Sequence, residues 1–88
     1  MEPSGGQLEP RLRQVLELEA SWWDLGVTKD RAAREQLGLS PARYHQSLDR
    51  AIDRPEALAQ HPMLVLHLRR LREQRRRARS VFPLGLGA

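Results

Sequence analysis

The 88-residue sequence has no cysteine and no apolar run of the roughly 20 residues that a membrane-spanning helix requires. Without cysteine the chain can form neither disulfide bonds nor thiolate–metal bonds. Aromatic residues are scarce, with two Trp, one Tyr and one Phe. No segment alternates polar and apolar residues as a half-buried strand does. These absences favour a small all-α domain without a membrane partner.

The patterns that carry catalysis are also missing. His45, His61 and His67 stand apart from one another, in none of the spacings of a metal site. The sequence has no glycine-rich phosphate loop and no nucleophile elbow. We therefore expect a protein that is not an enzyme, with no cofactor, no metal and no small-molecule substrate. Because the N-terminal residues lack a signal-peptide pattern, we also expect a cytoplasmic location.

Positive charge is concentrated in the last third of the chain. Residues 1–60 contain 8 Arg or Lys and 10 Asp or Glu, a net charge of −2. Residues 61–88 contain 7 Arg and 1 Glu, a net charge of +6. Affinity for phosphate comes from such cations, so we expect the C-terminal part to supply most of the attraction to any polyanionic partner.

Apolar periodicity and helix-breaking residues divide the chain into four helices and two ends. Residues 1–7 are rich in Gly, Pro and Ser and are expected to be disordered, whereas residues 8–80 are expected to form a single helical domain. Residues 81–88 contain too many helix breakers to continue a helix, although Phe82 could dock on the bundle. The helices are predicted over residues 10–24, 29–37, 41–54 and 62–80, with a short extra turn of helix within residues 55–61.

The most informative stretch is residues 28–48, which predicts a helix, a three-residue turn and a second helix. Gly38 can take the left-handed conformation that ends the first helix. Ser40 and Pro41 are typical of an N-cap and of the first helical position. This spacing is typical of a helix-turn-helix, whose second helix enters the major groove of DNA. Two helices joined in this way also occur as plain packing units.

The second of these helices has an apolar and a polar face. With Tyr44, Leu48 and Ile52 directed into the core, the opposite face presents candidates for base readout, namely Arg43, Gln46, Ser47 and Arg50. Arginine pairs with guanine and glutamine with adenine in the major groove. Alternatively these residues are merely solvated, with the last of them paired to Asp49 or Asp53. Those two acids also oppose a nearby phosphate backbone.

The segment 69–79 contains seven arginines in eleven residues. On a helix these side chains surround most of the circumference, which suits a grip on phosphates without base preference. A solvated surface, an RNA site and a contact with an acidic protein are the alternatives. The predicted phosphate contacts are Lys29, Ser40, Arg69, Arg70, Arg72, Arg75, Arg76 and Arg77, with the serine acting from a helix N-terminus.

Two apolar clusters could either pack in the core or contact a partner protein. The first predicted helix carries an apolar stripe over residues 12–23 that ends in two tryptophans, of which at least one is expected to face the core. The last predicted helix carries a leucine seam. Exposed Trp is enriched at interfaces, so either cluster could contact a partner or a second copy. The residues are Trp22, Trp23, Leu64, Leu68 and Leu71, with Met63 and Leu66 widening the seam.

Short motifs occur in a fixed order, at residues 22–23, 34–40, 43–48, 52–53, 62–65 and 68–72. They read Trp-Trp, Arg-Glu-x-Leu-Gly-Leu-Ser, Arg-Tyr-x-Gln-x-Leu, Ile-Asp, Pro-Met-Leu-Val and Leu-Arg-Arg-Leu-Arg. This series resembles a family of small actinobacterial proteins that is classed as a domain of unknown function and described as helix-turn-helix-like. The resemblance implies an intracellular helical protein and assigns no catalytic residue or ligand. The middle segment is also similar to region 4 of sigma factors, which reads a promoter element and contacts RNA polymerase.

Several positions depart from the pattern of that family. His45 stands in place of an aromatic residue, Asp49 in place of Asn, and His61 in place of an acid. Leu66 and His67 stand in place of two basic residues. The changes lower the positive charge near the expected binding face, and with it the expected affinity for DNA.

Two functions from different classes follow. The first is a transcription-related regulator, associated with the nucleoid, that binds double-stranded DNA through residues 41–54 and grips phosphates through residues 62–80. Dimerisation would give such a small module more specificity. The second is a protein-interaction module that uses the helix-turn-helix as a scaffold and binds RNA polymerase, a sigma factor or a second copy of itself. Nonspecific RNA or DNA binding by the arginine-rich segment alone is a further alternative.

Overall fold

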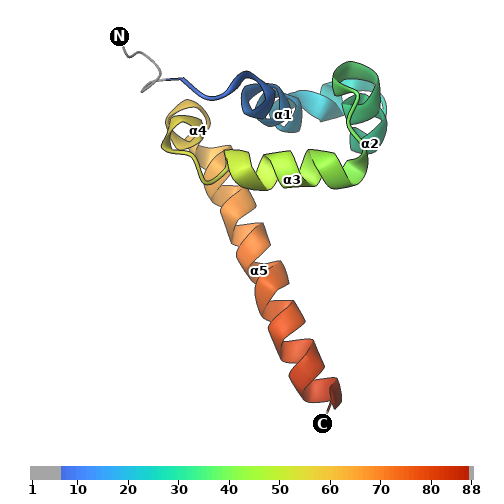
Figure 1. The fold of residues 1–88 in the computed structure, drawn as a ribbon, viewed down its shortest axis with the longest axis vertical. Coiled ribbons are helices and arrows are strands. Elements are labelled where there is room, and N and C mark those ends of the chain that lie inside the picture. Colours follow the sequence, from blue (N-terminus) through green and yellow to red (C-terminus); the bar gives the residue numbers. More distant parts are fainter. Residues whose placement is uncertain (1–6, 88) are drawn as a thin grey trace.

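The computed structural model describes the backbone of residues 7–87 and the side chains of residues 7–79. The expected disorder of residues 1–6 and the docking of Phe82 lie outside this description. The described residues form helices and no strand, which confirms the all-α class (Figure 1). The α-helices are α1 (Pro10–Ser21), α2 (Lys29–Ala32), α3 (Pro41–Ala51), α4 (Pro55–Gln60) and α5 (Pro62–Gly87), joined in part by a 3₁₀ turn, η2 (Trp22–Leu25), and a π turn, η3 (Ala33–Leu37).

The molecule consists of a body and a projecting helix. Helices α1 to α4 and the start of α5 form the body, and the rest of α5 extends away from it (Figure 1). The principal extents of 54 × 33 × 20 Å express this elongation. The body therefore holds the hydrophobic core, while most of the arginine-rich segment lies on the extension.

Helix α1 ends earlier than its apolar periodicity predicts. The predicted α-helix extends to Asp24, but its last turn is wrong, because residues 22–25 form the 3₁₀ turn η2. Ser21 departs from helical geometry at φ −141°, and the chain tightens into this turn. Gly26, at φ 72°, then ends the turn. The stripe itself is confirmed by Leu12, Val15 and Leu16, which are at most 4% exposed.

The predicted helix, turn and helix around residues 28–48 are present. Thr28 Oγ1 accepts a hydrogen bond from the Arg31 amide at 3.2 Å, and Ser40 Oγ accepts one from the Arg43 amide at 3.3 Å, so both caps are as predicted. Gly38 has φ 68°, the left-handed conformation predicted for it. The first segment differs in detail, since its second half, η3, is a π turn.

Helix α3 lies against α1 and completes the core. Tyr44, Leu48 and Ile52 are 1%, 6% and 1% exposed, which confirms the predicted apolar face. The helix ends at Ala51 and not at Arg54, because the Asp53 and Arg54 amides turn to carbonyls three residues earlier, at 3.4 and 3.0 Å. Arg54 itself precedes a proline, which disfavours the helical region, and it is extended at φ −87°, ψ 134°. The short helix expected within residues 55–61 is α4.

Helix α5 departs from its prediction at both ends. Val65 is fully buried, whereas Met63 and Leu66 are 81% and 47% exposed and do not widen the packed face as predicted. The packed face is instead set by Val65 with Leu64 and Leu68, which lie against the core. The predicted stop at residue 80 is also wrong, since the helical backbone continues to Gly87. The helical backbone thus passes through a proline, although an interior proline lacks the N–H donor and crowds the carbonyl four residues earlier.

Candidate nucleic-acid interface

The outward face of α3 carries exposed polar side chains in a stripe. Arg43, Gln46 and Arg50 are exposed and Ser47 is half-buried. The opposite face of the same helix is buried and its N-terminus is capped by Ser40, so the backbone that carries the stripe is held firmly. The helix thus presents two guanidinium groups and one amide, the donor and acceptor types that base edges in a major groove match.

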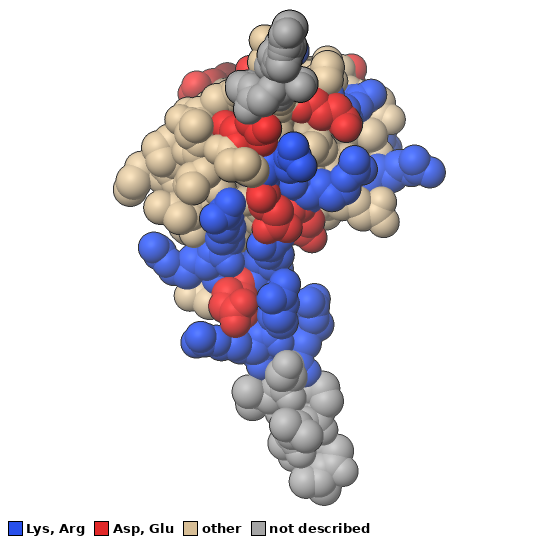
Figure 2. Space-filling view, turned by 60° about the vertical axis from the view of Figure 1, so that its left-hand side comes forward, with Lys and Arg blue, Asp and Glu red and all other residues tan. Residues whose placement is uncertain are grey.

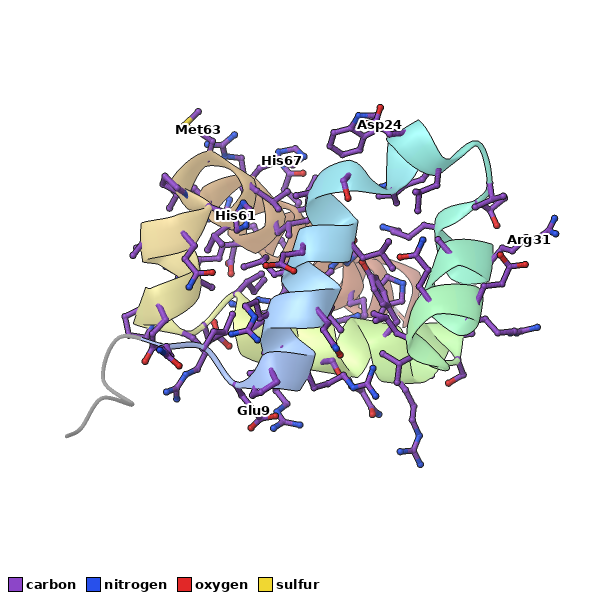
Figure 3. The ribbon with its side chains drawn as sticks, turned by 90° about the horizontal axis from the view of Figure 1, so that it is seen from above. Glu9, Asp24, Arg31, His61, Met63 and His67 are labelled. Carbon is purple, nitrogen blue, oxygen red and sulfur yellow. The ribbon has the colours of Figure 1, made fainter. Side chains whose placement is uncertain are left out.

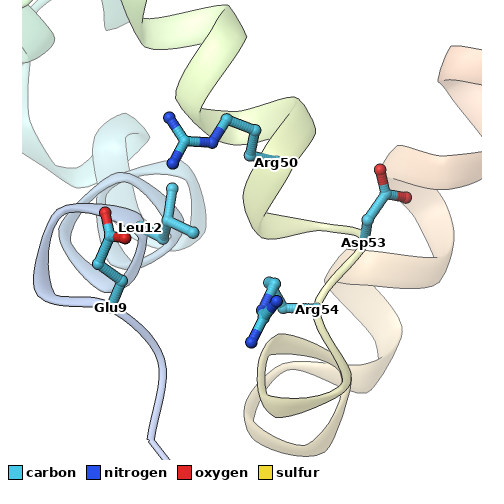
Figure 4. A pocket seen from close by; sticks show the side chains of 5 residues that line it. All are labelled: Glu9, Leu12, Arg50, Asp53 and Arg54. Atoms are coloured by element: carbon cyan, nitrogen blue, oxygen red, sulfur yellow. The ribbon is translucent and has the colours of Figure 1, made fainter.

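Arg50 lies beside a hollow of mixed charge. Glu9, Leu12, Arg50, Asp53 and Arg54 line it, and Arg50 and Glu9 flank Leu12 from two sides (Figure 4). Glu9 precedes α1, and no spacing in the sequence indicates that it approaches α3. Because two acids share this hollow with two arginines, it is a poor site for a small anion, and we place no ligand in it.

Two arginines of the arginine-rich segment are bound into the fold. Arg69 Nε donates a hydrogen bond to the Ile52 carbonyl at 2.6 Å. The Arg72 guanidinium donates to both carboxylate oxygens of Asp53, at 2.7 and 3.2 Å, and to the Asp49 carbonyl at 3.3 Å. The hydrogen bond from Arg72 holds the pKa of Asp53 below its usual value, against the opposing effect of partial burial, and the same contact raises the pKa of Arg72.

The remaining arginines of α5 face solvent. The exposed set is Arg70, Arg75, Arg76, Arg77 and Arg79. Arg76 and Arg77 both pair with Glu73, at 3.5 and 3.4 Å. Such exposed pairs contribute little, so these guanidinium groups can still turn toward a phosphate. Figure 2 shows cationic side chains along α5 and a second group across the body, with acidic side chains between them.

Lys29 contacts a buried carboxylate instead of facing outward. Its Nζ lies 3.2 Å from Glu19 Oε2 and 5.9 Å from the centre of the Trp22 ring. The other oxygen of Glu19 accepts a hydrogen bond from the Tyr44 hydroxyl at 2.7 Å, and that hydroxyl also lies 3.3 Å from the Val15 carbonyl. Burial, followed by the hydrogen bond to Glu19, raises the pKa of Tyr44.

The structure therefore divides the predicted phosphate contacts into residues that have a role within the fold and residues that face solvent. Lys29, Arg69 and Arg72 have partners within the protein, and Ser40 caps α3. The others lie exposed on α5, and Arg79, which the sequence analysis left out, joins them. Contact of the exposed set with phosphate stays a prediction.

The apolar clusters divide in a similar way. Trp22 packs against the core and Trp23 is 59% exposed, with the two rings edge to face at 6.4 Å. In the seam, Leu64 and Leu68 pack against the core, while Leu71 is half-buried. Among residues 7–79, the large apolar side chains that lie exposed are thus Trp23, Leu25, Met63 and Leu66. Figure 3 shows Met63 and His67 at the same edge of the molecule as Asp24, the neighbour of Trp23 in the chain.

Neither a metal site nor a membrane-spanning helix is found among the described residues. No three His, Cys, Asp or Glu side chains within residues 7–79 are grouped as metal ligands would be. None of the helices described here combines the length and the apolar character that crossing a bilayer demands.

Fold and site together define the class: a small all-α domain with a capped helix that presents Arg and Gln outward and a long helix with exposed arginines. Over residues 7–80 the chain matches the model of a family described as "Protein of unknown function (DUF3263)", and it belongs to that family. This confirms the resemblance to a family of unknown function. The chain matches no curated protein and no solved structure.

Proposed function

We propose that this protein binds double-stranded DNA, with the outward face of α3 in the major groove and the exposed arginines of α5 on phosphates. Its helix, turn and helix would then serve as a helix-turn-helix in a transcription-related, nucleoid-associated regulator. The observation that carries the proposal is the stripe of Arg43, Gln46 and Arg50, exposed on a helix whose other face is buried. A firmly held helix with such donors and acceptors suits base readout.

The pairing of Asp53 supports the same proposal. In the sequence, Asp49 and Asp53 weigh against DNA because both lie close to the expected phosphate path. In the fold, Arg72 pairs with Asp53 through two hydrogen bonds. One of the two opposing negative charges is therefore compensated, and the exposed arginines of α5 outnumber the one acid in the sequence of that helix, Glu73.

The test separates base readout from phosphate contact. Arg43→Ala should weaken binding to a selected duplex by about 1–3 kcal/mol and relax the preference at one base pair, because it removes a base contact. Arg76→Ala should weaken binding to all sequences alike and reduce the salt dependence by about one phosphate contact. Arg31→Ala is the control, since it removes one exposed positive charge on α2 that pairs locally with Glu35. Equal effects of Arg43→Ala and Arg76→Ala on selected and random duplexes would contradict the assignment of α3.

A second function, a protein-interaction module, is favoured by a different observation. Trp23 and Met63 are 59% and 81% exposed, and Met63 lies at the same edge of the molecule as η2, which carries Trp23 (Figure 3). Trp is enriched at interfaces with proteins, and RNA polymerase, a sigma factor or a second copy would be the partner. The same titrations distinguish the two functions, because a pure interaction module shows no affinity for duplex DNA and retains a protein partner after nuclease treatment.

A further inference from the structure

Two arginines of α5 satisfy the C-terminal end of α3. The last carbonyls of a helix have no partner within the helix, and cationic side chains are favoured there by the helix dipole. At the end of α3 the Asp53 amide turns to the Arg50 carbonyl at 3.4 Å, which leaves the Asp49 carbonyl to another donor. Arg72 provides that donor, and Arg69 donates to the Ile52 carbonyl. We call the contacts of Arg69 and Arg72 with residues 49–53 the latch.

The latch is strengthened by the ion pair and by packing. The two parallel hydrogen bonds between Arg72 and Asp53 fix the direction of the pair as well as its distance. The Arg72 side chain is only 21% exposed, so this end of the ion pair is partly shielded from solvent. Val65 and Leu68 pack into the body two turns and one turn before Arg72 on the same helix. Helix α5 is therefore held by contacts from its first turns up to Arg72.

Beyond the latch, α5 has the character of a free arm. Every residue from 73 to 79 is exposed, and five of these seven residues are charged. At about 1.5 Å of rise per residue, the seven residues extend the helix by about 10 Å. Arg75 still lines a groove with His45 and Asp49, on a flank of α3 next to its buried face, so the arm begins beside α3. The latch thus sets the direction in which the arm leaves this helix.

We propose that the latch makes the protein selective for duplex DNA over a single strand, by holding the α3 face and the arm at a fixed separation. A duplex offers a groove and its flanking phosphates at fixed positions, so two attached sites with the right spacing bind it together. A single strand bends to meet each site and gains little from a fixed spacing. Arg69 and Arg72 are then positioning residues, and the arm arginines contact phosphate. This inference rests on the proposed function.

Two aspartates, Asp49 on α3 and Asp53 in the turn just after it, provide a matched test, because they differ in the latch and not in charge. The Asp53 carboxylate is part of the latch, whereas Asp49 contributes only its backbone carbonyl, and its carboxylate forms no ion pair within residues 7–79. Removal of either carboxylate adds one unit of positive charge near the C-terminal end of α3. Electrostatics alone therefore predicts tighter binding for both variants. The latch predicts opposite signs.

The experiment measures fluorescence anisotropy of the full chain with a labelled duplex of about two helical turns and with one of its strands. We expect Asp53→Asn to weaken duplex binding by about fivefold or more, because the arm loses its direction, while Asp49→Asn tightens it. On the single strand both variants should bind at least as tightly as the wild type. Arg72→Lys, which keeps the charge but loses the fork, should also weaken duplex binding selectively.

Each outcome decides the matter. Tighter duplex binding by both aspartate variants, together with unchanged binding by Arg72→Lys, would overturn the latch as a positioning device and leave the proposed function standing. Failure of the wild type to bind the duplex would instead contradict the proposed function, and this inference with it. Circular dichroism and thermal unfolding of all three variants establish that they are folded. If Asp53→Asn does not fold, the comparison of Arg72→Lys with the wild type decides.

Discussion

At the scale of single residues, the most constrained group is the Glu19 carboxylate. It is 7% exposed, and a buried carboxylate is costly unless it is paired and hydrogen-bonded. Tyr44 from α3 and Lys29 from α2 supply its two partners. One acid on α1 thereby joins three helices, and it also gives Lys29 an ion-pair partner within the protein.

The cluster predicts the effect of removing one oxygen. Tyr44→Phe leaves the ring in place but leaves Glu19 with one buried oxygen lacking its donor, which should lower the free energy of unfolding by about 1–3 kcal/mol. Urea denaturation followed by circular dichroism measures this difference. The control is Glu35→Gln, which weakens an exposed pair with Arg31 and should change stability by less than about 1 kcal/mol. Equal, small effects of the two variants would contradict a role for the cluster in holding the helices together.

Sequence reasoning reaches only part of this residue-scale detail. The buried face of α3 is predictable because Tyr44, Leu48 and Ile52 recur at helical spacing. The partner of Glu19 and the latch are not, because each depends on a contact between residues distant in the chain. A charged residue has the same sequence signature whether it is solvated or paired, so Arg69 and Arg72 could not be told apart from Arg70 and Arg75.

At the scale of elements, starts were predictable and ends were less so. Pro10, Pro41 and Pro62 begin helices as expected, since proline suits the first helical position. The ends depend on competition between the helical ladder and local turns. Ser21 ends α1 early, and α5 continues past the residues that were expected to stop it.

The turn between η3 and α3 gives a prediction at this scale. Gly38 has φ 68°, and a Cβ added there would meet no atom within 4 Å. The cost of Gly38→Ala is therefore a backbone cost alone, about 1–2 kcal/mol for a left-handed conformation. Gly38→Asn is the matched variant, because Asn tolerates this conformation better. Thermal and urea unfolding should rank the wild type above Asn and Asn above Ala, and an Ala variant as stable as the wild type would contradict the account of the turn.

At the scale of the whole molecule, the positive charge is concentrated on the part of the chain that extends from the body. The sequence shows a net charge of −2 in residues 1–60 and +6 in residues 61–88, and the fold places much of that positive charge on a helix that leaves the body (Figures 1 and 2). The separation of charge was predictable from composition. The direction of the helix was not, because the latch that sets it joins residues 49–53 to residues 69–72.

The exposed apolar residues lie on another part of this molecule. Met63 and His67 share an edge with the η2 turn that carries Trp23 (Figure 3). A surface for DNA and a surface for a protein are therefore compatible in one small domain. Binding of DNA remains the proposed function, since it accounts for the stripe on α3 and the exposed arginines of α5 together.

Selection of random duplex DNA by the purified protein at two salt concentrations tests whether α3 reads bases. We expect an enriched sequence motif that persists at the higher salt, because contacts with base edges are less sensitive to salt than contacts with phosphates. Binding without any motif, lost as the salt concentration rises, would contradict base readout by α3 and leave α5 as a nonspecific contact with polyanions.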